Sequence, residues 1–576
     1  MKTSGYRTAL CARAWRKRGL RETGPLVAYD LETSPIPRRG SIEPRFFTLY
    51  AQGLQVATRI ETYAQLSSVL ETVLQLHEPG TRFVAWNANR FDLRLVMAAL
   101  VEHNPRFVVH PFVAKGHGLR GASVACGSDR WLFLDGMAML GLACGLDEFL
   151  KAFAPKYRKL KGIDFDREAF DARNPAHVAY AKRDAEGLWH GMMRAEAIMR
   201  KLTRRPLAPT IGNVAVKTFA ANMPAGVEVW PLVDAQDAIV RTIVLRGGFV
   251  HCARPYEGPA WVFDLNQAYA AVMRENDLPC GGTVATRRLV RGRCGVYRVV
   301  ISRAEPAIVP FYARTLAGKP VTTYGAPVET WITSIEVRAL RRFGWNVHVM
   351  QGWYWTGRFR MSRFVTKLEN LRRKHRAGTP VNIMVKALGC NAYGKTVERV
   401  PKGEFLLSKI APPQAFPVED VGPYVWFKPS KYDSRRAYHR PQLGAFITAA
   451  VRMKVFAAAN KDPRAFLYAD TDSVAFSRPV RLPVSRVEYG KWKRESNGER
   501  YIIIGKKVYA RIAPRKVICK GLHTRPLSIA VMRRWLRTGV PPVQLQSQLL
   551  GWRKSLKPEW RPLRRSGTDT RKTRRP

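Results

Sequence analysis

The sequence predicts a multidomain protein that combines α/β and α+β architecture, and three observations lead to this fold class. At 576 residues, the chain is too long for one small core and is expected to divide into three or more subdomains. Its hydrophobic content of 46% is enough for several packed interiors, as in a globular protein. Short apolar runs that end in polar turns are interspersed with helix-like stretches, which indicates strands between helices.

The first third of the chain is expected to form strands with helices around them. The segment PLVAYDLETSP (25–35) predicts a buried strand that ends in a polar turn. Residues 81–100 predict a strand, a loop and then a helix. Residues 174–202 predict a long helix, because Asn174 suits the N-cap and Pro175 the first helical position.

Three segments of the second half place candidate functional residues on regular elements. Residues 258–273, GPAWVFDLNQAYAAVM, predict a strand that runs into a helix. Residues 361–378 and 380–395 predict a pair of helices, broken at the Gly-Thr-Pro sequence of 378–380. The segment FLYADTDSVAF (466–476) predicts a β-hairpin, because apolar residues flank the polar DTDS on both sides.

The net charge of +53, from 97 Lys and Arg against 44 Asp and Glu, is the dominant feature of the composition. Solubility alone needs a net charge of only about 2 to 8 in a small domain. A larger excess destabilises the compact state unless a polyanion neutralises it, so we expect a nucleic-acid partner, ahead of a membrane surface. The arginine-rich first 24 residues are interpreted as a basic arm in preference to a targeting segment.

The sequence does not suggest a membrane span, a disulfide framework or a zinc site. The longest apolar run considered, GMAMLGLACGL (136–146), is shorter than the roughly 18 residues of a membrane-spanning helix. The eight cysteines are scattered without a C-x-x-C pair. Free thiols suit a reducing compartment, so we expect a cytoplasmic protein.

The predicted hairpin carries Asp470 and Asp472 at its tip. Residues i and i+2 of a strand point to one face, so both carboxylates could converge on a single cation. Taken alone, the pair is more typical of a plain turn, since Asp, Ser and Thr are good turn formers. A calcium loop is excluded, because Ala475 and Arg481 stand where such a loop requires Gly and Glu.

A third carboxylate shifts the interpretation toward chemistry. Asp264 also ends an apolar strand, and adjacent central strands would place it beside Asp472. Such a pair could hold two Mg²⁺ ions about 3.5–4 Å apart. Two such ions could activate a 3′-hydroxyl, clamp a triphosphate and stabilise the departing pyrophosphate.

Lysines on the predicted helix pair could contact the phosphates of a triphosphate. Lys386, Cys390 and Tyr393 fall at i, i+4 and i+7 and therefore share one helix face. Lys374, at the end of the preceding helix, could reach the same phosphates. Exposed helical lysines are usually just solvated, and for Lys374 alone this plainer interpretation is preferred.

The N-terminal third carries its own acidic set. Asp30 and Glu32 stand at i and i+2 of the first predicted strand, on one face. Asp92 closes the sequence NANRFD, and Asp184 lies four residues after Tyr180, on the same face of the long helix. Each pattern is common by chance, so only their combination is informative.

With these residues in place, the sequence resembles the family B DNA polymerases. DLNQAY (264–269), KALGCNAYGK (386–395) and YADTDS (468–473) are similar to the family's motifs A, B and C, and they follow in that order. The resemblance implies that Asp264, Leu265 and Asp472 are metal ligands and that Asp470 supports them. It implies that Tyr269, with Tyr393 beside it, is the gate that rejects a ribose 2′-hydroxyl. It also implies that Lys374 and Lys386 contact the phosphates, and that Lys507 and Tyr509 form a K-x-Y element at the primer end.

The upstream acidic set is similar to the family's proofreading exonuclease motifs D-x-E, N-x-x-x-F-D and Y-x-x-x-D, in the same order. The resemblance implies that Asp30, Glu32, Asp92 and Asp184 bind two metal ions and that Tyr180 orients the attacking water. It further implies contacts with a single-stranded 3′ end from Thr33, Asn87 and Phe91, and a supporting role for Lys161.

The resemblance is strongest to the small protein-primed polymerases of bacteriophages, through LRGGF (245–249) and KLKGIDF (159–165). It implies an RNase H-like 3′–5′ exonuclease domain followed by a right-hand polymerase of palm, fingers and thumb, with two insertions. The expected divisions are a basic arm (1–24), exonuclease (25–205), first palm part (206–275), terminal-protein insertion (276–360), fingers (361–397), second insertion (398–438), second palm part (439–522), and thumb with basic tail (523–576).

Three departures from the family pattern stand out. Residues 267–270, Gln-Ala-Tyr-Ala, replace the usual S-L-Y-P of motif A. Cys390-Asn391 replaces the Asn-Ser pair of motif B, and Leu245 replaces the Tyr of Y-x-G-G. The carboxylates, the gate tyrosine and the lysine are kept, so we expect an active enzyme, with changes in nucleotide affinity and in the coordination of synthesis with editing.

We therefore expect a DNA-dependent DNA polymerase with a proofreading exonuclease and two Mg²⁺ or Mn²⁺ ions in each active site. Its expected partners are primer–template DNA, deoxynucleoside triphosphates and a terminal priming protein, and its expected state is a monomer that replicates a linear viral or plasmid genome. One alternative is a polymerase that extends ordinary primers. A metal-dependent glycosyltransferase, which also uses D-x-D, and a non-catalytic DNA-binding protein are less favoured, because of the exonuclease set and the intact carboxylates respectively.

Overall fold

The chain divides into two compact units, and each is described by itself. The unit that holds the hairpin, here the hairpin unit, combines Met1–Ala12, Asn222–Arg373 and Ala437–Trp560. The other, here the first-sheet unit, combines Arg13–Ala221, Lys374–Arg436 and Arg561–Pro576. The computed structural model describes residues 9–10, 24–33, 43–89, 91–113, 119–163, 169–203, 206–303, 309–323, 326–398, 403–407, 416–419, 425–429, 438–519 and 527–539.

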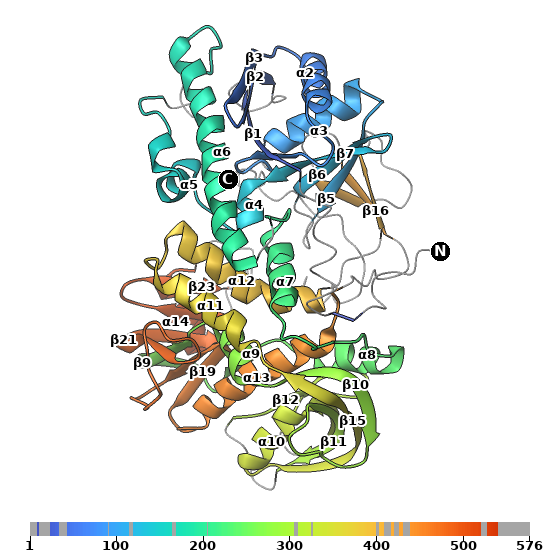
Figure 1. Cartoon of the computed structure of the whole chain (residues 1–576). Helices are drawn as coiled ribbons and strands as arrows, with labels where there is room; N and C mark the ends of the chain where they lie inside the picture. The colour runs from blue at the N-terminus through green and yellow to red at the C-terminus, as the bar shows by residue number, and fades with distance from the viewer. Residues whose placement is uncertain are drawn as a thin grey trace. The chain divides into compact units, whose positions relative to one another are not determined.

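The first-sheet unit is built on a seven-stranded sheet of order β3-β2-β1-β4-β7-β6-β5 (Figure 1). Its interior strand β1 pairs antiparallel with β2 and parallel with β4, so both edges of β1 are paired. Aromatic side chains such as Tyr29, Phe47, Phe83 and Phe133 form its buried interior. The strands are β1 (Leu26–Thr33), β2 (Pro44–Ala51), β3 (Leu54–Arg59), β4 (Arg82–Ala85), β5 (Val108–Val113), β6 (Leu119–Cys126) and β7 (Asp129–Asp135).

The long helix predicted after Asn174 is α6 (Pro175–Thr203), which packs on β1 and β2 (Figure 1). The Asn174 side chain accepts a hydrogen bond from the N–H of Ala176 at 2.9 Å, so the predicted N-cap is confirmed. The other helices and strands of this unit are α2 (Tyr63–Leu76), α3 (Asp92–His103), α4 (Gly136–Leu140), α5 (Leu146–Phe153), η2 (Pro155–Tyr157), α7 (Ile211–Ala221), α12 (Pro380–Val397), β16 (Gly403–Leu407), β17 (Phe416–Glu419) and β18 (Val425–Pro429).

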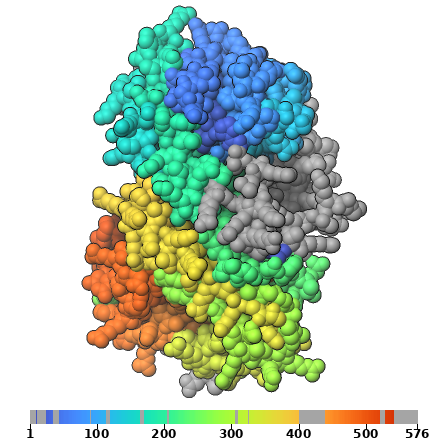
Figure 2. All heavy atoms as spheres, viewed as in Figure 1, coloured from blue at the N-terminus to red at the C-terminus, as the bar shows by residue number. Residues whose placement is uncertain are grey.

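The hairpin unit contains a second seven-stranded sheet, of order β23-β22-β21-β9-β20-β19-β8. Every neighbouring pair in it is antiparallel, and the predicted strand at 258–265 is the central β9. The C-terminal strands, in orange, form part of the exposed surface seen in Figure 2. The strands are β8 (Phe249–Cys252), β9 (Tyr256–Leu265), β19 (Phe466–Thr471), β20 (Ser473–Phe476), β21 (Trp492–Gly505), β22 (Val508–Arg511) and β23 (Lys516–Cys519).

The hairpin unit also holds a four-stranded sheet of order β10-β15-β11-β14, which is followed along the chain by helix α11. All three strand pairings of this smaller sheet are antiparallel. The remaining elements of the unit are α8 (Asp234–Ile239), η3 (Val240–Val244), α9 (Ala268–Glu275), β10 (Leu278–Thr286), β11 (Gly295–Ser302), β12 (Tyr312–Arg314), β13 (Pro320–Thr322), β14 (Val328–Thr333), α10 (Ser334–Arg342), β15 (Asn346–Phe359), α11 (Ser362–Arg373), α13 (Pro441–Ala459) and α14 (Ile529–Thr538).

Helix α13 is apolar and long enough to span a membrane, by length and composition only. The expectation that no segment reaches this length was therefore wrong for α13. Its most apolar window is 89% buried inside the protein, as in the core helix of a globular unit.

The predicted helix pair is present, with a shorter first helix than expected. Helix α11 ends at Arg373, five residues before Gly378, and Gly378 has the positive φ of 84° typical of a turn. Helix α12 begins at Pro380, as predicted for proline at a first helical position. Most of the expected basic arm, the tail beyond residue 539 and much of the expected second insertion lie outside the described residues.

Candidate active sites

The hairpin of β19 and β20 is present as predicted, with a tight turn between its aspartates. Asp470 pairs with Ser473 across the hairpin, and the N–H of Asp472 donates to the Asp470 carbonyl at 2.7 Å. Thr471 has a φ of +65°, which is rare for a β-branched residue, and strained backbone of this kind concentrates at functional sites. The carboxylates thus do not lie on one straight strand, as their spacing predicted, because the turn intervenes.

The structure brings Asp264 and Asp472 together through neighbouring strands. Asp264, near the end of β9, pairs with Ser473 of β20, the residue next to Asp472. The N–H of Leu265 donates to the carbonyl oxygen of Asp472 at 2.8 Å. The Leu265 side chain is buried, so only its main chain is available to a ligand. Two carboxylate-bearing residues from segments about 200 residues apart therefore lie side by side at one end of the sheet, and they offer the hard oxygen donors that Mg²⁺ prefers.

Asp470 faces a cation supplied by the chain itself. The Lys507 ammonium forms an ion pair with Asp470, and the Lys507 main-chain N–H donates to the Tyr468 hydroxyl at 2.9 Å. The rings of Tyr468 and Tyr509 lie 5.3 Å apart. Burial, followed by the charge of Asp470, raises the pKa of Tyr509 to about 12. The two K-x-Y residues, Lys507 and Tyr509, therefore lie against the hairpin of β19 and β20.

The turn that follows Asp264 leads directly into helix α9. Gln267 has a left-handed φ of +47°, a conformation that costs a non-glycine residue on the order of 1–2 kcal/mol. Tyr269, the expected gate residue, lies half-buried in the first turn of α9. The strained turn fixes the direction in which α9 and its tyrosine leave the carboxylate strand.

The LRGG segment (245–248) packs closely against the hairpin. A Cβ atom on Gly248 would lie 2.7 Å from the Cα of Thr471, so only glycine permits this approach. The carbonyls of Arg246 and Gly247 accept hydrogen bonds from the Arg452 guanidinium at 2.7 and 3.0 Å. The sequence motif LRGGF identifies the glycines. It does not point to Arg452, because this residue lies on the apolar helix α13, outside any recognised motif.

A buried carboxylate holds this arginine in place. Glu336 of α10 is fully buried, and it forms ion pairs with Arg452 at 2.8 Å and with Arg246. Thr333 completes the set with a capping box, in which its N–H donates to Glu336 at 3.0 Å. A cavity of about 180 Å³ is lined by Arg246 and Arg452, and also by Lys506 and Tyr312. Glu336, Arg246 and Arg452 together form the Glu336 triad.

The expected phosphate-binding lysines lie in the first-sheet unit. Lys374 follows the end of α11 and is exposed. Lys386 is exposed on α12, one turn before Cys390 and two turns before the half-buried Tyr393, so the three share a helix face. Their exposure is compatible both with phosphate contacts and with plain solvation.

The upstream acidic set gathers around β1. Asp30 and Glu32 alternate with the buried Leu31, so they share the other face of β1. The Asp92 carboxylate, at the start of α3, accepts a hydrogen bond from the N–H of Leu31 at 3.1 Å. Asp184 of α6 contributes to the raised pKa of Asp30 and of Glu32, which reflects its closeness to both. The structure therefore brings all four predicted carboxylates together.

Burial, and then neighbouring negative charges, disfavour the ionised forms of these four carboxylates. Burial first, and then the charges of its neighbours, raises the pKa of Asp30 well above its ordinary value. Burial raises the pKa of Glu32 and of Asp92 to about 7, and that of Asp184 to about 6. A cluster of this kind gains free energy when a cation binds, because the cation relieves both the burial and the repulsion.

A lysine of the chain partly supplies this positive charge. The Lys159 ammonium lies 2.6 Å from Asp184 Oδ2 and 4.7 Å from the centre of the Tyr180 ring. Burial alone would lower the pKa of Lys159, but the charge of Asp184 and the hydrogen bonds to Asp184 and Tyr180 together outweigh it, so the pKa is raised. The supporting lysine is therefore Lys159 and not the expected Lys161, which is exposed. Both lie in one basic run, and only the tertiary contact distinguishes them.

The acidic cluster has an oxygen available for a metal ion. The second Asp184 oxygen, Oδ1, is buried and accepts no hydrogen bond in the described part of the chain. Within the same described residues, no three Asp, Glu, His or Cys side chains are gathered tightly enough to ligate one ion as they stand. The donor set suits Mg²⁺ or Mn²⁺, and small side-chain movements would be needed to close around the ion.

The other residues implied for this site flank the cluster. Thr33 ends β1, and Asn87 lies in the loop after β4 with a positive φ of 59°. Phe91 is the half-buried residue directly before α3. Sequence reading missed Asp135, which is buried and accepts hydrogen bonds from the N–H groups of Asn89 and Ala138 at 3.1 and 3.2 Å. Asp135 therefore fixes the loop that carries Asn87 and Phe91.

Comparison with known proteins identifies relatives with this arrangement. Residues 188–409 match the family described as DNA polymerase type B, organellar and viral. A stretch of 111 residues is 30% identical to the DNA-directed DNA polymerase of Enterobacteria phage PRD1, and it spans 19% of this chain and only 19% of that relative.

The fold extends the similarity to most of the chain. The Phi29 DNA polymerase in complex with primer-template DNA and incoming nucleotide superposes with a TM-score of 0.70 at 15% identity, over 88% of this chain and 94% of that one. Its orthorhombic crystal form gives a TM-score of 0.64 at 16% identity, over the same shares. The expected multidomain architecture is thereby confirmed. Over residues 188–409 the chain is thus similar to the type B DNA polymerases of organelles and viruses, and over most of its length it shares the fold of Phi29 DNA polymerase.

Proposed function

We propose that this protein is a DNA-dependent DNA polymerase with a 3′–5′ proofreading exonuclease. The observation that carries the proposal is the meeting of Asp264 and Asp472 at the ends of β9 and the hairpin. Nucleotidyl transfer needs two carboxylates at one point, because paired metal ions require shared oxygen ligands. The name of the PRD1 relative and the fold of the Phi29 enzyme support the same reaction.

In the polymerase site, Asp264, Asp472 and the main chain of Leu265 would hold the metal pair. When bound, Mg²⁺ or Mn²⁺ supplies activation of the primer 3′-hydroxyl and charge stabilisation at the leaving pyrophosphate. Lys507 neutralises Asp470, so Asp470 supports the hairpin without adding repulsion between the other two carboxylates. We infer that Tyr509 positions the primer end and that Tyr269 excludes a ribose 2′-hydroxyl. Lys374, Lys386 and Tyr393 would contact the incoming nucleotide.

In the exonuclease site, Asp30, Glu32, Asp92 and Asp184 would hold two ions that activate a water molecule. Lys159 keeps Asp184 ionised and lies over Tyr180, so it fixes the tyrosine that would orient the water. Thr33, Asn87 and Phe91 would hold the single-stranded 3′ end. This arrangement supports hydrolysis of the terminal phosphodiester, which is the chemistry of proofreading.

We further infer that replication begins on a terminal protein, in the cytoplasm of a host cell. In support, residues 278–359 form a separate four-stranded sheet between the segments of motifs A and B, where the resemblance expects an insertion. The alternative is a polymerase that extends ordinary DNA primers. The glycosyltransferase alternative loses support, because the fold matches Phi29 DNA polymerase over 88% of the chain.

A primer-extension assay tests the proposal. Wild-type protein with Mg²⁺ is expected to extend a primed template in the presence of all four deoxynucleoside triphosphates, and Asp472→Asn is expected to abolish extension. Normal extension by Asp472→Asn would overturn the proposed site. Adding a partner protein with a Ser, Thr or Tyr hydroxyl to an unprimed template distinguishes protein priming, which labels that partner with the first nucleotide.

A further inference from the structure

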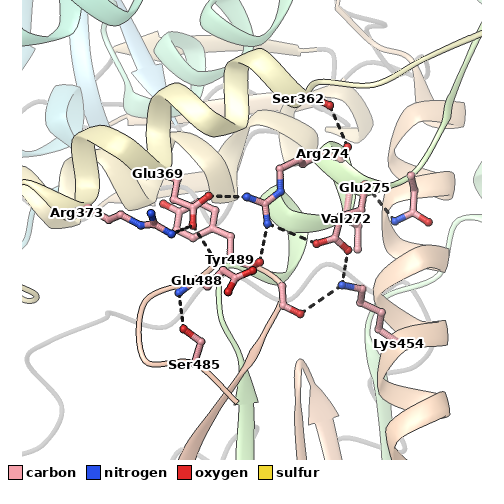
Figure 3. A network of polar contacts seen from close by, with 12 residues as sticks. Val272, Arg274, Glu275, Ser362, Glu369, Arg373, Lys454, Ser485, Glu488 and Tyr489 are labelled. Atoms are coloured by element: carbon pink, nitrogen blue, oxygen red, sulfur yellow. Dashed lines mark hydrogen bonds and ion pairs between the residues drawn. The ribbon is translucent and has the colours of Figure 1, made fainter. Parts of the chain in front are cut away.

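A buried network ties the motif A helix to the base of α11 and to the segment 485–491 (Figure 3). Its centre is Glu369, which is 4% exposed. One Glu369 oxygen lies 2.5 Å from an Arg274 nitrogen. The other accepts hydrogen bonds from Arg373 at 2.8 Å and from the N–H of Tyr489 at 3.2 Å. Glu369 therefore joins helix α9, helix α11 and the segment before β21.

The same network holds the main chain of Tyr489 at both its N–H and its carbonyl group. The Glu369 carboxylate accepts a hydrogen bond from the Tyr489 N–H, and the Arg274 guanidinium donates one to the Tyr489 carbonyl oxygen at 2.7 Å (Figure 3). The Tyr489 side chain is buried. Lys454 of α13 adds an ion pair with Glu275 at 2.5 Å, next to Arg274. Removal of the Glu369 charge would leave the 24% exposed Arg274 without its carboxylate partner, which is unfavourable, whereas the 50% exposed Arg373 can turn to solvent.

The 485–491 segment in turn forms hydrogen bonds with Asn266, the residue that directly follows strand β9. The N–H of Gly490 donates to the Asn266 carbonyl at 2.8 Å, and the N–H of Asn266 donates to the Lys491 carbonyl at 3.0 Å. The Asn266 side chain donates to the Ser485 carbonyl at 2.7 Å. All three hydrogen bonds of Asn266 thus lead to the 485–491 segment, one residue from Leu265 and two from Asp264.

The geometry of Gly490 makes this contact specific. Its φ is +80°, and a Cβ atom there would lie 2.4 Å from the Glu275 carboxylate. Only glycine can therefore turn the segment toward Asn266 beside the Glu275–Lys454 pair. Each link from Glu369 to Asn266 is a direct hydrogen bond or a single residue of chain.

We propose that Glu369 is a positioning residue of the polymerase site, which fixes the Asp264–Leu265 strand end through Tyr489, Gly490 and Asn266. The inference rests on the proposed polymerase function and deepens it, because Glu369 would act on the site through Tyr489, Gly490 and Asn266. Groups that orient metal ligands from behind typically change metal affinity or activity by about 10–100-fold when they are lost. Glu369 also lies on α11, so it links the strand end to this helix.

The variant that tests this role is Glu369→Gln, which keeps the shape of the side chain and removes its charge. The matched control is Asp277→Asn, because Asp277 also pairs with two arginines, Arg358 and Arg360, at 2.8 and 2.6 Å. Those arginines are 52% and 54% exposed, so this control removes the same charge at a solvated position.

The first measurement is amide hydrogen exchange in metal-free protein, followed by mass spectrometry. We expect peptides that cover 262–270 and 485–491 to exchange about tenfold faster in Glu369→Gln than in wild type and Asp277→Asn. The second is the Mg²⁺ concentration for half-maximal nucleotide incorporation, which we expect to rise about tenfold or more in Glu369→Gln. The half-saturating primer–template concentration is expected to change less than twofold.

Unchanged exchange in both segments, or an unchanged Mg²⁺ requirement, would overturn the proposal. If Glu369→Gln fails to fold, Arg274→Lys replaces it, because lysine keeps the charge but cannot bridge Glu369 and Tyr489 together. The same two shifts in Arg274→Lys support the proposal, and their absence overturns it. Failure of wild-type protein to incorporate nucleotide would instead refute the proposed function, while the exchange measurement would still decide the positioning role.

Discussion

The main-chain N–H of Leu265 donates a hydrogen bond to the carbonyl oxygen of Asp472, and the two atoms are 2.8 Å apart. This contact joins the end of the central strand β9 to the turn of the β19–β20 hairpin. Because it uses main-chain atoms on both sides, either carboxylate can change without loss of the bond that holds the two residues together. The arrangement therefore separates the fold of the site from its chemistry.

The first prediction follows from that separation. Asp264→Asn and Asp472→Asn are each expected to lower the rate of nucleotide incorporation by about 10²–10³-fold or more, because an amide is a poor ligand for Mg²⁺. The melting temperature is expected to stay within about 2 °C of wild type, since the main-chain contact remains. Primer extension and calorimetry on the same preparations check this. A large fall in melting temperature would show that the carboxylates themselves hold the hairpin.

The second prediction separates the two sites. Replacement of Asp30 and Glu32 together by Ala is expected to abolish 3′ degradation of single-stranded DNA while primer extension remains measurable, because these residues lie on β1 of the other unit. Gel assays of degradation and extension measure both activities. Loss of the two activities together would mean that the sites are not independent.

The third prediction concerns pH. The raised pKa values of Glu32, Asp92 and Asp184 mean that the folded protein binds protons more tightly than the unfolded chain near these groups. Their contribution to stability is fully present below the unfolded pKa of about 4 and is lost as pH rises through 6 to 7. In EDTA, the melting temperature of the first-sheet unit is expected to fall between pH 5 and pH 8.

Variants and metal give the controls for this pH dependence. Asp92→Asn is expected to flatten the fall, because it removes one of the carboxylates that must ionise. Addition of Mg²⁺ at pH 8 is expected to restore stability and to release protons, since the cation favours the ionised forms. Calorimetry and proton release in weakly buffered solution measure these effects. A melting temperature that rises from pH 5 to pH 8 in EDTA would contradict the prediction.

The fourth prediction distinguishes the two lysines of the KLK sequence. Lys159→Met is expected to lower exonuclease activity by about 10–100-fold, because it removes the cation 2.6 Å from Asp184 and frees the Tyr180 ring. Lys161→Met is the matched control and is expected to lower it less than threefold. Polymerase activity is expected to be unchanged in both. Equal effects of the two substitutions on degradation would argue for a general loss of basic charge.

The fifth prediction addresses stability. Glu336→Gln is expected to destabilise the hairpin unit by about 3–5 kcal/mol, because it leaves Arg246 and Arg452 buried without their shared carboxylate. Glu329→Gln, in a half-exposed pair with Arg298, is expected to cost less than about 1 kcal/mol. Urea unfolding followed by tryptophan fluorescence measures both. Equal losses of unfolding free energy in the two variants would show that burial of the Glu336 triad does not increase the contribution of its ion pairs to stability.

Local patterns in the sequence were sufficient for the elements that carry the sites. The strand at β1, the cap of α6 by Asn174, the strand-to-helix passage at β9 and α9, and the hairpin at β19 and β20 were all predicted correctly, because each depends on neighbouring residues. The end of α11 was placed five residues too late, since nothing in LRRKHRAG forbids helix before Gly378. The membrane test passed by α13 was overlooked, because its apolar stretch includes Arg452 and Lys454.

The sequence by itself determined the resemblance to a polymerase family, the order of the motifs and the choice of candidate carboxylates, because metal chemistry requires those residue types at those spacings. Only the tertiary structure decided that a turn separates Asp470 from Asp472, that Lys159 and not Lys161 pairs with Asp184, and that Glu336 and Glu369 are buried among arginines. These features depend on contacts between segments tens to hundreds of residues apart. No local pattern encodes them, since the partner of a charged side chain is set by packing.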